Sequence, residues 1–358
     1  MNSKDNYISI AKAIAIILMV VAHAMPPEKT IRFISLFHMP LFFFYSGYFL
    51  KISNNTESLK LFIKKRVKGL YLPYIKWSLF FLFTHNIFYR IGIYNSDYVY
   101  YNVHQSLYEI KDFILHAIMI IFTMDYHEQL LGGFWFLKTL FLSSLLVSFL
   151  MFTTRRFNKN TAIVLWIILW VTTILLRKSN ISLPIFGRAY LITFGSLFYI
   201  SGYLYHIYEE KLNLINRGCF FSLLLLILIA IYYPGSLSMT SLSASCVFIY
   251  PIFAFLGISF IAYISRILNN TQMRFSLYYI GQHTMPILAL HMLAFKIVNL
   301  IKIWHYGMKP EQLAEFPVIQ NNNEIYWILY AIVAICLPLL ANKLYNMIIY
   351  KLNKKCLK

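Results

Sequence analysis

The chain has 358 residues, of which 59% are hydrophobic and only 13% are charged. A soluble domain carries about 25% charged residues, so a chain this apolar could not cover a water-exposed surface, whereas a lipid bilayer removes that requirement. The formal net charge of +19 would suggest nucleic-acid binding, but most basic residues directly follow apolar runs. That placement is typical of membrane-protein loops, and no nucleic-acid partner is expected.

Ten apolar segments are long enough to cross a bilayer as helices, which takes roughly 17–25 residues. They are residues 7–24, 34–51, 71–92, 134–152, 161–177, 187–206, 218–234, 242–264, 283–301 and 325–349. A further run, 113–123, is too short and is expected to be re-entrant or interfacial. Because there are no internal repeats, linkers or appended soluble region, residues 1–358 are predicted to form one domain, an all-α polytopic membrane bundle of about ten helices.

The charges between these segments predict an orientation. Nineteen Lys and Arg residues fall on the side of the N-terminus, nine on the other side and four within apolar runs. The positive-inside rule therefore places both termini in the cytoplasm. One alternative stays open, because Lys4 and Lys12, the apolar run 13–21 and the triplet Ala22-His23-Ala24 are also typical of a cleavable signal peptide. Cleavage would leave nine helices and an external N-terminus.

Ionisable residues within a membrane are costly and by default indicate a functional site. In the first segment, His23 follows Lys12 by eleven residues, or about 16 Å along a helix. His38 lies near the outer end of the next segment, at a comparable level. Lys138 lies one turn after Trp135. The cytoplasmic half is predicted to contain Lys76, His283 and His291. These depths predict a polar tunnel reaching from one face towards the other.

Each of these residues also has an ordinary structural interpretation. Lysines such as Lys12 and Lys138 can extend to the interface, and histidines such as His38 and His283 can simply end a helix. The other histidines are expected to be solvated in loops or at span boundaries: His85, His104, His116, His127, His206 and His305. Among the intramembrane groups, histidine alone titrates near neutrality unaided, so a histidine is the natural proton acceptor.

The sequence has no Walker loop, no H-E-x-x-H and no G-x-S-x-G motif. Its four cysteines have no C-x-x-C spacing, and Asp and Glu are not found in the predicted spans. No metal is therefore expected.

Five blocks in chain order resemble the membrane acyltransferase-3 family, particularly its fucose 4-O-acetylase-like sugar acetyltransferases. The first helix of that family has a basic residue, ten intervening residues and a histidine, as do Lys12 and His23. The blocks are YISIAKAIAIILMVVAHA (7–24), FHMPLFFFYSGYFLK (37–51), FIKKRVKGLYLPY (62–74), GFWFLKTLF (133–141) and YIGQHTMPILALHML (279–293). The second is similar to the F-H-M-P-L-F-F-F-x-S-G-Y block of the family. The last three are similar to its Arg-rich cytoplasmic loop, its W-F-L block and its ninth helix.

The resemblance implies a ten-helix core that retains its first helix and lies in a bacterial cytoplasmic (inner) membrane. It implies transfer of an acetyl group from cytoplasmic acetyl-coenzyme A, a co-substrate, to a sugar hydroxyl. The acceptor would be a surface polysaccharide or its lipid-linked precursor. The hypothesis makes His23 and His38 catalytic. The coenzyme phosphates would be bound by Lys12, Lys64, Lys65, Arg66 and Lys68. The site would be lined by Ser46, Trp135, Lys138, His283 and His291.

Two positions depart from the family pattern. Lys12 stands where the family usually has arginine, and lysine lacks the planar fork that binds phosphate with two hydrogen bonds. The usual Arg-x-x-Arg pair reads here as Arg66 followed by Gly69, with Lys65 and Lys68 alongside. A basic patch for the donor is still predicted, with a different arrangement of cations.

Direct attack by the acceptor and an acyl-histidine intermediate both remain open. The main alternative function is a transporter or flippase for a lipid-linked glycan, in which the same polar groups line a passage. A purely structural membrane scaffold would need no buried histidine or lysine.

Overall fold

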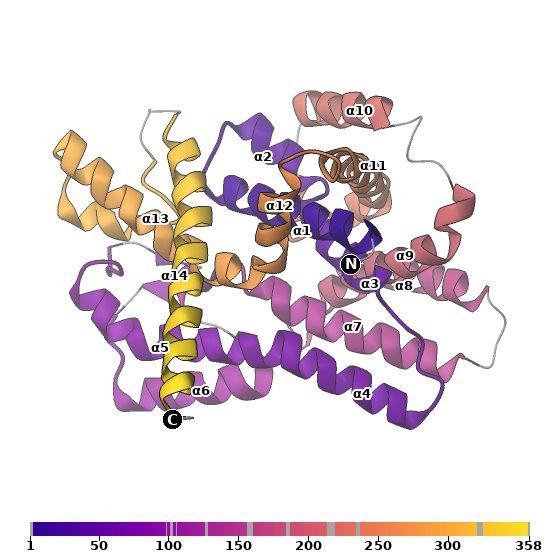
Figure 1. The fold of residues 1–358 in the computed structure, drawn as a ribbon, viewed down its shortest axis with the longest axis horizontal. Coiled ribbons are helices and arrows are strands. Elements are labelled where there is room, and N and C mark those ends of the chain that lie inside the picture. The colour runs from indigo at the N-terminus through magenta and orange to yellow at the C-terminus, as the bar shows by residue number, and fades with distance from the viewer. Residues whose placement is uncertain are drawn as a thin grey trace.

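The computed structural model describes residues 3–97, 99–100, 103–104, 106–125, 128–155, 160–183, 187–212, 219–233, 237–320 and 325–356. Helices dominate these ranges (Figure 1). The strands described there form two small antiparallel pairs: β1 (Val99–Tyr100) with β2 (Val103–His104), and β3 (Ser182–Leu183) with β4 (Gly187–Arg188).

The helices run in the following order along the chain. They are α1 (Ser3–His23), α2 (Glu28–Ser35), α3 (His38–Tyr48), α4 (Thr56–Arg66), η1 (Val67–Tyr71), α5 (Leu72–Arg90), α6 (Ile110–Thr123), η2 (Gln129–Leu131), α7 (Trp135–Thr153), α8 (Thr161–Lys178), α9 (Ala189–Leu212), α10 (Cys219–Tyr232), α11 (Ala244–Leu268), α12 (Arg274–Gln282), α13 (Thr284–Tyr306), η3 (Pro310–Ala314) and α14 (Tyr326–Cys356).

Within the described ranges, six helices are long and apolar enough to cross a membrane: α1, α7, α8, α11, α13 and α14. Helices α5 and α9, with 19 and 24 residues, also have spanning length. The predicted helical membrane bundle is confirmed, while the count of ten spans and the cytoplasmic termini stay predictions. The run 113–123 lies in α6, whose 14 residues extend about 21 Å, less than the ~30 Å hydrocarbon core.

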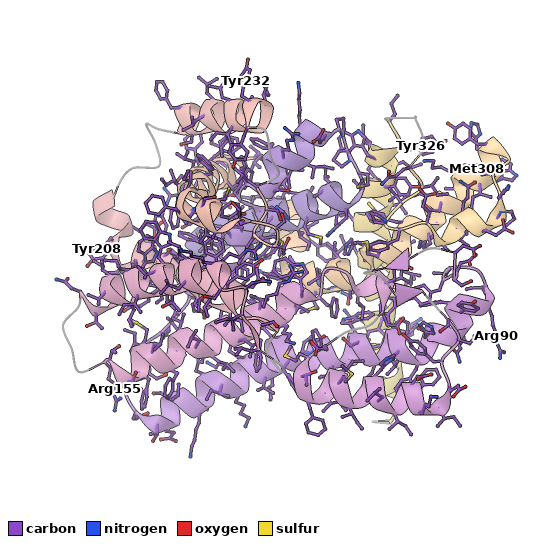
Figure 2. All side chains as sticks on the ribbon, turned by 180° about the vertical axis from the view of Figure 1, so that it is seen from behind. Arg90, Arg155, Tyr208, Tyr232, Met308 and Tyr326 are labelled. Carbon is purple, nitrogen blue, oxygen red and sulfur yellow. The ribbon has the colours of Figure 1, made fainter. Side chains whose placement is uncertain are left out.

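Figure 2 shows two pairs of labelled residues at opposite ends of the molecule. Arg155 and Tyr208, both predicted on the cytoplasmic side, lie at one end, and Arg90 and Met308, both predicted outside, lie at the other. The side of the membrane on which each end lies stays a prediction. Four basic residues of that pattern, Arg156, Lys159, Arg217 and Lys358, lie outside the described residues.

The second predicted span, 34–51, is divided in the structure. Its first residues belong to α2, and α3 begins at His38 and ends at Tyr48. Pro40 explains the start, because a proline in the first turn of a helix lacks only an N–H that has no partner there. The 11 residues of α3 extend about 16 Å. This short helix places His38 inside the bundle.

A long rod forms one side of the molecule, where α4, η1 and α5 follow one another without a break (Figure 1). It begins with a capping box, in which Asn55 Oδ1 accepts from the backbone N–H of Ser58 at 2.8 Å and Ser58 Oγ accepts from that of Asn55 at 3.2 Å. Between the two helices, η1 is π-helical. Such bulges occur frequently at functional sites.

Glycines set the closest contacts between helices around the centre. A Cβ on Gly47 would overlap the carbonyl oxygen of Tyr199, and one on Gly202 would overlap that of Phe44, so α3 and α9 cross with their backbones in contact. A Cβ on Gly281 would likewise overlap the carbonyl of Ser9, where α12 meets α1. Small residues permit such close approach in membrane helices. These crossings fix the positions of α1, α3 and α12.

The structure corrects the prediction that His85 is solvated. Its side chain is fully buried in α5, with Nδ1 3.0 Å from Glu128 Oε2 and Nε2 2.8 Å from the carbonyl of Ser106. Its ring stacks on Tyr108, with centroids 3.5 Å apart. The histidine thus ties the segments on both sides of α6 to α5. His206 and His305 are exposed and His116 is half-buried, while His127 and the side chain of His104 are not described.

Two buried lysines of α13 hold the segment that follows it. Lys296 Nζ donates to the carbonyls of Leu313 and Glu315 at 3.0 and 2.8 Å, and Lys302 Nζ donates to that of Ile319 at 2.8 Å. Carbonyl partners satisfy the ammonium groups where water is excluded. Lys296, which falls in an apolar run of the sequence, therefore has a structural role.

Candidate active site

A cavity of about 440 Å³ lies in the middle of the bundle. Its walls come from α1, α2, α3, η1, the start of α7, the junction of α12 and α13, and the segment 237–240. The described residues that line it include one lysine and two histidines, but no Asp or Glu. The wall of the cavity is therefore polar at these three side chains, and its described residues carry no negative charge.

Helix α1 sets the long dimension of the cavity. Lys12 and His23 both line it, and eleven residues at 100° each bring them within about 20° around the helix axis and about 16 Å apart along it. The ammonium group of Lys12 lies 5.3 Å from the ring centre of Phe49. We call the region around Lys12 the basic end of the cavity and the region around His23 the histidine end.

Three histidines from three helices meet at the histidine end. Nδ1 of His38 lies 2.8 Å from the carbonyl of Ile34, and Nδ1 of His291 lies 2.9 Å from that of Leu288. Because a carbonyl only accepts hydrogen bonds, each Nδ1 carries the proton and each Nε2 carries a lone pair.

His23 has the same tautomer through a different partner. Its Nδ1 lies 3.1 Å from the sulfur of Met19, a weak acceptor that has no hydrogen to donate. Its ring lies 5.2 Å from that of His291, at an interplanar angle of 32°. Each of the three rings thus has an unprotonated Nε2 atom. Among the described residues, no group of three His, Cys, Asp or Glu side chains is arranged to hold a metal ion.

The basic end is formed beside the π-helical turn η1. Arg66 is half-buried, donates from Nη2 to the hydroxyl of Tyr199, and lies 4.9 Å from the ring centre of Phe62. The next turn contributes Gly69 and Leu70 to the cavity wall. Within the described ranges neither Arg66 nor Lys12 has an acidic partner. Two cations without an acidic partner among the described residues, one lining the basic end and one beside it, fit a polyanionic ligand.

The structure brings together some of the predicted site residues. Five of them line the cavity: Lys12, His23, His38, Ser46 and Trp135. Two others adjoin it, since His291 packs on His23 and Arg66 precedes the wall residues Gly69 and Leu70.

The remaining predicted residues lie elsewhere. Lys64, Lys65 and Lys68 are exposed on the rod outside the cavity. Lys138 forms an ion pair with Asp125, with Nζ and Oδ1 2.5 Å apart, instead of lining the wall. His283 faces a different groove, between α12 and α14, which it lines with Lys343 and Lys351.

Several residues of the cavity wall were not predicted from the sequence, because their side chains are neutral. Gln282 lines the basic end and donates from Nε2 to Ser9 Oγ at 2.8 Å. Ser35, Ser238 and Thr240 contribute hydroxyl groups from α2 and the segment 237–240. Gln282 precedes His283 in a block that the resemblance had already singled out, which is the one signal that could have found it.

A largely buried carboxylate was also missed, since α9 extends past its predicted end to include Glu209, whose side chain is 10% exposed. Its oxygens accept hydrogen bonds from Tyr7 at 3.0 Å and Tyr48 at 2.7 Å, and Arg266 lies 2.7 Å away. This network joins α1, α3, α9 and α11 and does not line the cavity.

The fold and the cavity together define a multi-pass membrane protein with a central chamber that is basic at one end and histidine-rich at the other. A family model described as an acyltransferase domain, that of the acyltransferase-3 family, matches residues 5–343. The chain belongs to this family and is a membrane acyltransferase. No curated protein and no solved structure matches the chain significantly.

Proposed function

We propose that the protein transfers an acetyl group from cytoplasmic acetyl-coenzyme A to a sugar hydroxyl of a surface polysaccharide or its lipid-linked precursor, in a bacterial inner membrane. The observation that carries this proposal is the arrangement of one cavity, with unpaired cations at its basic end and histidine bases about 16 Å along α1. A donor with a phosphate-rich head and a thioester at its far end suits this arrangement.

The residues at the basic end bind the donor head. Arg66 is half-buried and held by Tyr199, so its remaining N–H groups are oriented before the donor arrives. A guanidinium suits phosphate because its planar fork donates two parallel hydrogen bonds. Lys12 adds a second positive charge deeper in the cavity. The exposed lysines Lys64 and Lys65 attract the donor over a longer range, in a salt-dependent manner.

The chemical step takes place at the histidine end. The acceptor hydroxyl oxygen attacks the thioester carbonyl carbon while His23 Nε2 takes the hydroxyl proton. The carbon–sulfur bond breaks, and the coenzyme thiolate leaves with a proton returned by His23. The products are an acetyl ester and free coenzyme A. His38, with its Nε2 directed by the bond to Ile34, orients the acceptor.

A comparison of host strains tests this function. Strains with the wild-type protein, His23→Ala and His305→Ala are compared by mass spectrometry of the surface glycan, with protein levels checked by immunoblot. His305 is the matched control because it is an exposed histidine outside the cavity. We expect loss of acetyl groups in His23→Ala alone. Normal acetylation in that strain would contradict the assignment, and glycan translocation without any acetylation would favour the transporter.

A further inference from the structure

The histidine end lacks the group that usually supports a histidine base. In a serine-hydrolase triad, a carboxylate accepts from Nδ1–H and stabilises the imidazolium. Here the acceptor at His23 Nδ1 is the thioether of Met19, 3.1 Å away, and no Asp or Glu is among the described lining residues. A positive charge formed on His23 therefore needs another partner in an apolar surrounding.

His291 offers that partner. Its side chain is fully buried, its Nδ1–H is engaged by the carbonyl of Leu288, and its Nε2 has no hydrogen-bond partner among the described residues. A buried nitrogen left without a partner is costly and requires an explanation. The ring centres of His291 and His23 are 5.2 Å apart. A single N–H···N bond of about 3 Å fits that separation, because each nitrogen lies off its own ring centre.

We propose that His291 is a positioning residue for His23, in the place that a carboxylate occupies in a triad. When His23 Nε2 takes the acceptor proton, the Nδ1–H of His23 turns from the sulfur of Met19 to Nε2 of His291. No proton passes to His291, whose Nδ1–H stays on the Leu288 carbonyl. The lone pair of His291 stabilises the charge on His23 until that proton is returned to the thiolate.

The other titratable groups nearby do not fill this role. His38 from α3 lines the cavity and is available to the acceptor, whereas His291 does not line it. Lys12 on α1 is about 16 Å away along the helix. On α13, Lys296 and Lys302 are occupied by backbone carbonyls. On α14, Tyr330 donates to Asn299 Oδ1 at 2.6 Å.

A pair of substitutions of similar size tests the inference, which rests on the proposed function. His291→Leu removes the acceptor, while His291→Gln keeps an amide oxygen. Initial rates of acetyl transfer from added acetyl-coenzyme A are measured across a range of pH in inside-out membrane vesicles that contain the host glycan. Met292→Leu is the folding control, because Met292 is buried beside His291 but does not line the cavity.

We expect His291→Leu to lower kcat by about 10- to 100-fold, the effect of one hydrogen bond to a charged group, with an unchanged KM for acetyl-coenzyme A. The acid limb of its pH–kcat profile moves to lower pH, because the imidazolium of His23 has lost its support. His291→Gln recovers much of the wild-type kcat, and the acid limb of its pH–kcat profile returns towards the wild-type pH.

Equal rates in the two His291 variants would overturn the positioning role, and so would an acid limb of His291→Leu at the wild-type pH. In either case, acetyl transfer by the wild-type protein would still uphold the proposed function. An absence of transfer by the wild-type protein would overturn both.

Discussion

Arg66 is expected to contribute more to donor binding than any of the lysines around it. It is half-buried and fixed by Tyr199, while Lys64 is exposed. A hydrogen bond to a charged group contributes about 1.5–3 kcal/mol, so Arg66→Ala should raise the KM for acetyl-coenzyme A by about 10- to 100-fold. An exposed ion pair contributes about 0.2–1 kcal/mol, so Lys64→Ala should raise it by only about 2- to 5-fold.

Initial rates in inside-out vesicles, measured over a series of acetyl-coenzyme A concentrations, give these KM values. Arg155→Ala is the matched control, because Arg155 is an exposed arginine whose Nη1 donates to the carbonyl of Phe152. Arg66→Lys should fall between wild type and Arg66→Ala, since lysine keeps the charge and loses the fork. The reasoning is refuted if Lys64→Ala raises KM more than Arg66→Ala does, or if Arg66→Ala behaves like Arg155→Ala.

Three further predictions concern stability, which is measured by thermal unfolding in detergent, and the third also concerns the KM for acetyl-coenzyme A, which is measured in vesicles as above. Gly47→Ala should lower Tm markedly or prevent folding, because its Cβ would overlap the Tyr199 backbone; a wild-type Tm would show that α3 and α9 can separate at no cost. His85→Ala should destabilise the protein by about 3–5 kcal/mol, because it leaves the buried carboxylate of Glu128 unpaired; a loss below about 1 kcal/mol would contradict this. Lys138→Ala should lower Tm slightly and leave the KM for acetyl-coenzyme A unchanged, because Lys138 pairs with Asp125 outside the cavity; a raised KM would show that Lys138 contributes to donor binding.

The sequence predicted the helical membrane class well, because apolar length is a property of consecutive residues. It failed where helices break or continue for local reasons. The run 34–51 is mainly apolar and gives one span signal, yet α3 begins only at His38, where Pro40 fits the first turn of a helix. The polar residues 56–66 give no span signal, yet they form a helix continuous with α5 through η1. Hydropathy does not report such continuity.

The residue types of the site could be predicted from the sequence, but the contacts that each site residue makes could not. The spacing of Lys12 and His23 places both on one face of α1, and the structure shows both in the cavity wall. Whether a cation faces the cavity depends on contacts distant in sequence. Arg66 is held beside the cavity by Tyr199, 133 residues away in the sequence, whereas Lys138 is paired with Asp125. The unpartnered Nε2 of His291 is likewise visible only once α1 and α13 are packed.

The central claim is that His23 acts as the base in acetyl transfer from acetyl-coenzyme A. The most direct test is the initial rate of acetyl transfer to the host glycan in vesicles that contain equal amounts of wild-type or His23→Gln protein. Removing a general base typically costs 10²–10⁴-fold, so we predict a loss of that order with an unchanged KM for the donor. A wild-type rate in His23→Gln would contradict the account.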